Sequence, residues 1–195
     1  MKIMLIFPPL VLEHRYHHGV GDAGGNLPPL GLLCIAAVLE RDGHEVRIID
    51  SPVENLDLEQ VGERIERFRP HFVGISAITQ LAKKTEALCK KIRQEHPEIK
   101  IFVGGPHPTA LPEEVLKLTQ ADLVITDEAE NVISEVIRDF DQFKEKRIVH
   151  AGKVKELDSL PLPARHLIDL KKYTALANNY KITPNSIHVV TSRGC

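Results

Sequence analysis

Short apolar runs alternate with amphipathic segments of helical length, and this alternation restricts the possible folds more than any other feature of the sequence. Five runs are typical of strands buried on both faces: 2–7, 45–50, 71–76, 100–105 and 121–126. Helical patterns follow them at 29–41, 57–69, 80–97, 112–118 and 128–140. Right-handed strand–helix–strand connections produce a parallel sheet with helices on both faces. We therefore predict an α/β fold with a doubly wound, five-stranded parallel sheet of the Rossmann or flavodoxin type.

Residues at the ends of two helical segments support this prediction. Pro29 suits the first turn of a helix, and Gly43 suits the left-handed position after its end. Asp57 and Gln60 have the spacing of a capping box at the start of the second helix.

The alternation stops after Phe143, where we place the end of the α/β domain, 1–143. Residues 144–186 are predicted to be a linker, with a small hairpin around Ala151 and Gly152 and a short helix. Pro161 and Pro163 are typical of a semi-rigid connector. Residues 187–195, "IHVVTSRGC" from Ile187, read as the first strand of a further unit.

Composition narrows the function classes. The net charge is −2 with no basic stripe, Trp is absent and aromatic residues make up 5%, so nucleic-acid binding is not indicated. Pro8 and Pro9 interrupt the apolar N-terminus, and no segment has the roughly 18 apolar residues of a membrane span. Three widely spaced cysteines without a CxxC motif favour a reducing cytoplasm, with Cys34 and Cys89 as small buried residues.

Ligands of open α/β sheets bind beyond the carboxyl ends of the strands. Ser76 and Thr79 follow the third predicted strand, and Gly104-Gly105 followed by Pro106-His107 end the fourth. Adjacent glycines allow close approach of a ligand, and a plain tight turn explains them equally well. His107 is open to two interpretations as well, a ligand-facing donor or a polar turn residue.

Several common sites are disfavoured by the sequence. The first strand is not followed by G-x-G-x-x-G, a P-loop is missing, and the acidic residues of a phosphoreceiver do not follow that strand. The loop before Pro28 contains His14, His17 and His18. Without Cys or carboxylate at ligand spacing, a solvated loop is favoured over a metal site there.

Four blocks of sequence together resemble a known family: "PPLGLLCIAAVLERDGHEVRIID", "PHFVGISAIT", "IKIFVGGPHPTALPEEVL" and "LPLPARHLI". In order and spacing they are similar to the N-terminal region of cobalamin-binding radical SAM enzymes, including the anaerobic magnesium-protoporphyrin monomethyl ester cyclase and cobalamin-dependent methyltransferases. The resemblance implies cobalamin, with its corrin over the strand ends and its nucleotide tail inside the fold. The positions it implies for cofactor binding are Ser76, Thr79, Gly104, Gly105, Pro106, His107 and Glu128.

The same resemblance gives a meaning to the C-terminal "SRGC". Cys195 would be the first of three thiolates that hold a 4Fe-4S cluster, whose open iron binds S-adenosylmethionine. The sequence is then expected to be a non-catalytic part of a larger enzyme, working with its own radical SAM domain in methyl transfer or oxidative cyclisation.

Two departures from the family pattern keep an alternative open. Where members often carry "GEGE", this chain has Asp127-Glu128-Ala129-Glu130, and the D-x-H-x-x-G motif that supplies a cobalt-binding histidine is absent. The second departure implies cobalamin without a protein imidazole on cobalt. The first supports a docking scaffold that has lost cobalamin; a nucleotide- or sugar-binding Rossmann domain is the weaker alternative.

Overall fold

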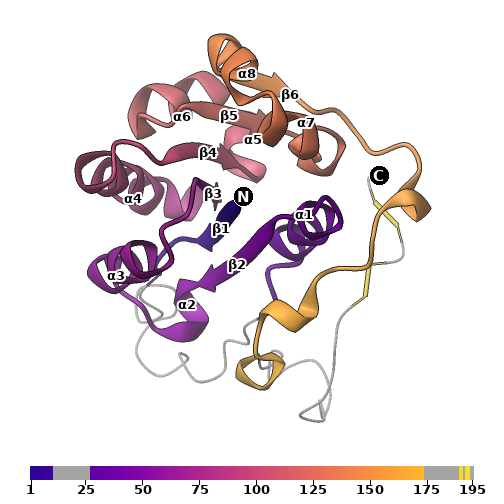
Figure 1. Cartoon of the computed structure of the whole chain (residues 1–195), viewed down its shortest axis with the longest axis horizontal. Helices are drawn as coiled ribbons and strands as arrows, with labels where there is room; N and C mark the ends of the chain where they lie inside the picture. The colour runs from indigo at the N-terminus through magenta and orange to yellow at the C-terminus, as the bar shows by residue number, and fades with distance from the viewer. Residues whose placement is uncertain (11–26, 174–188, 191, 194–195) are drawn as a thin grey trace.

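A six-stranded parallel sheet forms the centre of the molecule, in the order β2-β1-β3-β4-β5-β6 (Figure 1). The computed structural model describes residues 1–10, 27–173, 189–190 and 192–193. The strands are β1 (Lys2–Phe7), β2 (Glu45–Asp50), β3 (Phe72–Ser76), β4 (Lys100–Gly104), β5 (Leu123–Thr126) and β6 (Ile148–His150). The strand order reverses between β1 and β3, which is where such sheets open a crevice. The predicted fold class is confirmed, with one strand more than expected.

Helices cover both faces of the sheet, as the alternation predicted (Figure 1). They are α1 (Leu30–Arg41), α2 (Ser51–Glu54), α3 (Leu58–Phe68), α4 (Ala82–Glu95), α5 (Pro106–Ala110), α6 (Pro112–Thr119), α7 (Ile133–Arg138) and α8 (Phe140–Lys146). One core cluster joins α1, α7 and α8 to the sheet, and the other joins α3, α4 and α6 to its opposite face. Strand residues therefore alternate between two buried layers: Leu5 belongs to the first and Ile6 to the second.

Two of the predicted helix ends are confirmed, whereas Pro29 is the N-cap of α1 and lies just before the first helical turn. Gln60 N donates to Asp57 Oδ1 at 2.8 Å and Asp57 N donates to Gln60 Oε1 at 3.0 Å, which completes a capping box before α3. Gly43 follows α1 with φ of 81°, the left-handed conformation expected of it.

The hairpin expected around Ala151 and Gly152 is wrong. Ile148–His150 instead forms β6, which pairs in parallel with β5, so the sheet continues past residue 143. The physical reason is the crossover between them, because the helical segment after β5 divides into α7 and α8 and returns the chain to the amino end of the sheet. A run of three strand residues is too short for its partner to be recognised from sequence.

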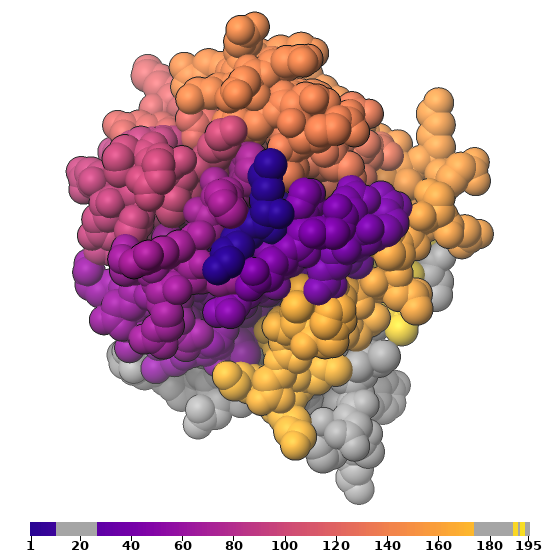
Figure 2. Space-filling view, viewed as in Figure 1, coloured from indigo at the N-terminus to yellow at the C-terminus, as the bar shows by residue number. Residues whose placement is uncertain are grey.

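The segment after β6 lies along α1, as the space-filling view shows (Figure 2). Ala164 is 2% exposed, and its N–H donates to Leu33 O at 3.0 Å. Tyr173 reaches the end of β2, where its hydroxyl donates to Asp50 Oδ2 at 3.0 Å. These contacts fix the described part of the predicted linker to the α/β unit.

Two further expectations concern the cysteines and membrane-spanning segments. Cys34 and Cys89 are buried free thiols, as predicted. Among the residues that the structure describes, no helix combines the length and apolar character needed to cross a membrane.

Candidate functional site

A cavity of about 450 Å³ opens at the carboxyl ends of β1, β3, β4 and β5, on the face covered by α1. Its floor is apolar and consists of Leu5, Gly74, Phe102 and Ile125. A Cβ at Gly74 would lie 2.4 Å from the Phe102 ring and 2.8 Å from Leu5 Cδ2. The glycine therefore lets an aromatic ring lie directly on the strand, which gives the cavity a flat apolar floor.

The walls of the cavity lack side chains at two glycines. A Cβ at Gly31, in the first turn of α1, would meet no atom within 4 Å. A Cβ at Gly104 would meet only Ile125 O, at 3.4 Å. Cys34 completes the α1 wall, and the pKa of its thiol is raised, chiefly by burial and secondarily by Glu130. The walls thus leave space for a bulky ligand.

Gly104 and Gly105 have different roles. The sequence left open whether this pair admits a ligand or only makes a tight turn, and each interpretation fits one of the two residues. Gly105 has φ of 106°, and a Cβ there would lie 2.9 Å from Ala77 O. That tight packing is held by Ala77 N donating to Gly104 O at 2.8 Å and by His107 N donating to Ala77 O at 3.1 Å. Gly105 is thus required by the turn itself, and Gly104 faces the cavity.

The structure brings together five of the positions predicted from sequence, since the cavity is lined by Ser76, Gly104, Gly105, Pro106 and Glu128. Thr79 is exposed at the start of a 3-10 turn, Thr79–Leu81, and is not among the lining residues. His107 is 6% exposed within α5 and also lies outside the lining. Cys195 and the histidines 14, 17 and 18 lie outside the described residues. Their roles stay predictions.

The loop after β5 contributes residues that sequence reasoning did not assign to the site: Asp127, Ala129 and Glu130. Asp127 has φ of 64°, so it adopts the left-handed conformation at the position of the first family glycine. Its N–H is held by Thr109 Oγ1 at 2.9 Å, and its carboxylate accepts from Thr126 Oγ1 at 2.9 Å. The loop therefore makes a glycine-type turn without glycine. Gly31 and Gly74 were also missed, although glycine inside a helix or strand is itself a signal of close approach.

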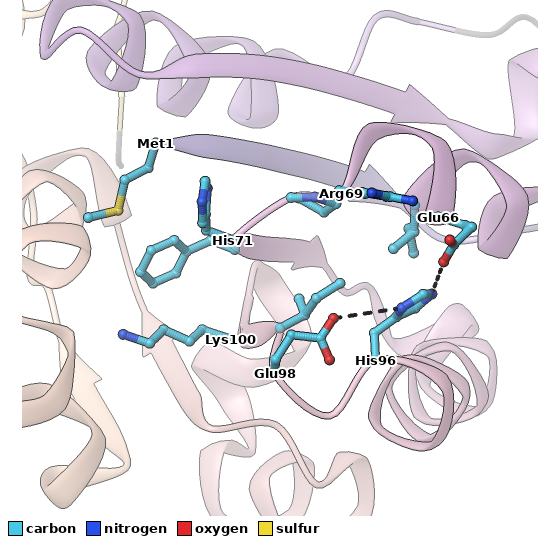
Figure 3. Close-up of a pocket in the computed structure, with 11 residues that line it drawn as sticks. Met1, Glu66, Arg69, His71, His96, Glu98 and Lys100 are labelled. Atoms are coloured by element: carbon cyan, nitrogen blue, oxygen red, sulfur yellow. Dashed lines mark ion pairs between the residues drawn. The ribbon is translucent and has the colours of Figure 1, made fainter.

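A second hollow, of about 560 Å³, lies at the amino ends of the strands (Figure 3). Several of its polar side chains have partners: His96 lies 3.5 Å from a Glu66 oxygen and 3.9 Å from a Glu98 oxygen, and His71 Nδ1 accepts from Lys2 N at 2.9 Å. Lys100 Nζ lies 5.3 Å from the centre of the Phe72 ring. This amino-edge hollow lies at the end of the sheet opposite to the one where such folds bind ligands, so we do not take it as the binding site.

The chain is similar to a methyltransferase and to a cyclase, both of them longer proteins. It is 29% identical over its whole length to an uncharacterized methyltransferase of Pyrococcus horikoshii, and it covers 43% of that protein. Over 73% of the chain it is 30% identical to the anaerobic magnesium-protoporphyrin IX monomethyl ester cyclase of Rubrivivax gelatinosus, covering 25% of it. The chain spans less than half the length of each of these relatives.

Solved structures show the same fold. The cobalamin-dependent S-adenosylmethionine radical enzyme OxsB, with aqua-cobalamin and S-adenosylmethionine bound, matches 88% of this chain and 25% of its own, with a TM-score of 0.69 and 16% identity. A cobalamin-binding protein of Desulfitobacterium hafniense matches 70% of this chain and 58% of its own, with a TM-score of 0.50 and 19% identity. A receiver domain of Escherichia coli RcsB reaches 0.51 at 14% identity, so fold similarity alone does not choose among functions.

The model of the B12 binding domain family makes that choice, because it matches residues 16–137. This match includes β3, β4, β5 and α1, which contribute most of the cavity lining, while β1 lies outside it, and it confirms the resemblance inferred from sequence. It favours the cobalamin-binding interpretation over the scaffold. The chain belongs to the B12 binding domain family.

Proposed function

We propose that the carboxyl-edge cavity receives the nucleotide tail of cobalamin, with the corrin ring over the strand ends. The observation that carries this proposal is the apolar cavity whose walls lack side chains at Gly31 and Gly104. Its volume, about 450 Å³, lies within the roughly 300–1,000 Å³ of known ligand pockets.

The lining residues fit the chemistry of that ligand. Phe102, Leu5 and Ile125 offer apolar contact to the aromatic base of the tail. Ser76 and Glu128 supply a hydroxyl and a carboxylate for its sugar and amide groups. When bound, cobalamin supplies the cobalt chemistry, and the residues of this chain bind and orient it.

We extend the proposal to the protein from which this chain comes. The relatives are longer than the chain, and one solved relative is a cobalamin-dependent radical enzyme. This supports a radical SAM enzyme of the methyltransferase or cyclase type, in which Cys195 is the first ligand of a 4Fe-4S cluster. The free thiols Cys34 and Cys89 are consistent with our placing it in a reducing cytoplasm.

Titration with hydroxocobalamin, followed by visible absorption and by retention on dialysis, tests the cavity. We expect saturable binding to the unaltered chain and roughly 100-fold weaker binding to Gly31→Leu, equivalent to about 2.7 kcal/mol, because the new side chain occupies the open wall. Gly31→Ala adds a single methyl group and is the matched control, with a smaller loss.

Glu98→Leu places the same side chain at the amino-edge hollow, and we expect it to leave cobalamin binding unchanged. The absorption bands also report whether an imidazole nitrogen occupies cobalt. Full binding by Gly31→Leu, or no binding by the unaltered protein at full length, would contradict the proposed site.

A further inference from the structure

The C-terminal residues Val190 and Arg193 lie at the carboxyl-edge cavity, far in sequence from the rest of its lining. Arg193 contacts two other parts of the wall, Cys34 on α1 and the loop after β5. Two residues of the stretch that the sequence predicts to start a further unit, Val190 and Arg193, therefore belong to the cavity wall.

Arg193 contacts α1 on one side and the loop after β5 on the other. Its Nη1 lies 2.9 Å from Glu130 Oε1 and 4.0 Å from Glu128 Oε2, and its Nη2 donates to Cys34 Sγ at 3.4 Å. The Glu130 side chain is 7% exposed and that of Arg193 is 26% exposed. A nearly buried carboxylate tolerates its charge only with a well-placed partner, so Glu130 and Arg193 stabilise each other.

One of the two acceptors, Glu128, is held by contacts that do not involve Arg193. Glu128 Oε2 accepts from Val154 N at 2.5 Å, and Glu128 N donates to Gly152 O at 3.1 Å. The left-handed turn at Asp127 precedes both glutamates. The guanidinium presents several N–H donors in one plane, which suits carboxylates held in fixed positions better than an ammonium group does.

We propose that Glu130 and Glu128 are a docking site for Arg193, and that this contact anchors the segment before Cys195 to the rim of the cavity. Arg193 is then a positioning residue: it holds its own part of the chain at the rim and keeps that side of the cavity closed. Anchoring stands on the contacts alone, and the effect on the cofactor rests on the function proposed above.

Trypsin tests the anchor without any cofactor, because a guanidinium held by Glu130 cannot enter the protease. In the full-length protein, we expect cleavage between Arg193 and Gly194, followed by mass spectrometry, to be at least tenfold faster in Glu130→Gln than in the unaltered protein. Glu135→Gln neutralises an exposed carboxylate on α7 and is the matched control, with no change expected. Equal cleavage in all three proteins would overturn the anchor.

Arg193→Lys tests the same contact from the other side if Glu130→Gln folds poorly, because it leaves both glutamates in place. Lysine keeps the charge but loses the fork, so we expect faster cleavage after residue 193 even though trypsin cuts after lysine more slowly than after arginine. Slower cleavage than in the unaltered protein would count against the anchor.

Release of bound hydroxocobalamin tests the second part. We expect Glu130→Gln to shorten the retention half-time at least tenfold with an unchanged bound spectrum, and Glu135→Gln to leave it unaltered. Equal half-times in the two variants would overturn the closing role. If the unaltered protein binds no cobalamin, the proposed function fails, while the trypsin result still decides the anchor.

Discussion

The two edges of the sheet differ: hydrogen bonds and ion pairs join the elements at the amino edge, whereas the carboxyl edge leaves a cavity open. At the amino edge, Asp122 before β5 accepts from Arg93 Nη2 at 2.7 Å and from Ile101 N at 2.8 Å, and Lys144 Nζ lies 3.3 Å from its other oxygen. At the carboxyl edge, Gly31 and Gly104 leave space that the protein does not fill.

Stability and ligand binding therefore depend on different residues in this domain. Charged groups at the amino edge hold β4, β5, α4 and α8 together through one carboxylate, Asp122, whose side chain is 9% exposed. The carboxyl edge instead keeps its backbone in shape through turns at Gly105 and Asp127. Changes at Asp122 should therefore affect folding, and changes at the open cavity walls, Gly31 and Gly104, should affect binding.

Asp122→Ala is expected to have the largest effect on stability. It leaves Arg93 Nη2 and the buried Ile101 N without their acceptor, so the free energy of unfolding should fall by about 3–5 kcal/mol. Urea denaturation measures this change. Burial alone would raise the pKa of Asp122, but the hydrogen bonds from Ile101 and Arg93 lower it below its ordinary value, so its contribution is present above that ordinary pKa and is lost only as pH falls through the lower, folded value.

Asp141→Ala is the matched control at the same edge. Asp141 is 90% exposed and lies 3.8 Å from Lys100 Nζ, so its loss should change stability by less than about 0.5 kcal/mol. If the folded fraction of Asp122→Ala lost cobalamin affinity, or if the two variants were equally stable, the separation of the edges would be wrong.

Asp50, at the carboxyl end of β2, should make stability depend on pH. Burial raises its pKa to about 6 from 3.8, and the hydrogen bond from Tyr173 only partly offsets this. The folded state therefore binds more protons than the unfolded state between these values, so stability falls as pH rises from about 4 to above 6, by about 3 kcal/mol in total.

Asp50→Asn should remove that loss. The free energy of unfolding of the variant, relative to that of the unaltered chain, should grow between pH 4 and 6.5 and stay constant above. A weaker hydrogen bond to Tyr173 should lower the variant's stability by about 1 kcal/mol at every pH. Urea titrations across this pH range measure the difference, with the exposed Asp158→Asn as control. A difference independent of pH would show that Asp50 is ionised throughout.

Gly105→Ala and Gly104→Ala compare neighbouring positions within the carboxyl edge. The first forces a side chain into positive φ against Ala77 O and should cost about 1–3 kcal/mol of stability. The second should cost less than about 1 kcal/mol and should instead weaken cobalamin binding. Thermal unfolding and titration together separate the two, and the reverse pattern would place the cavity wall at Gly105.

Sequence periodicity predicted β1 to β5 and the helices between them, because buried strands leave an apolar signal that neighbouring residues share. It could not predict β6, because these three residues form a strand only by pairing with the edge of β5. It also could not divide the roles of Gly104 and Gly105, since that depends on where Ala77 lies. Arg193 at the cavity was out of reach for the same reason: its partners are 63 or more positions away in sequence, at Glu130 and Cys34.

The smallest expected effect compares one left-handed residue at each edge. Gln120, after α6, has φ of 57° and Asp127 has φ of 64°. Glycine relieves the cost of this conformation, so Gln120→Gly should gain up to about 1 kcal/mol of stability.

Asp127→Gly gains the same relief but loses the bond from Thr126 Oγ1, so its net change should lie near zero. Thermal unfolding of both variants and of Thr126→Val measures the two contributions separately. Equal gains for Gln120→Gly and Asp127→Gly would show that the Thr126 contact contributes nothing, and that the loop after β5 keeps its shape through the backbone and the Thr109 contact alone.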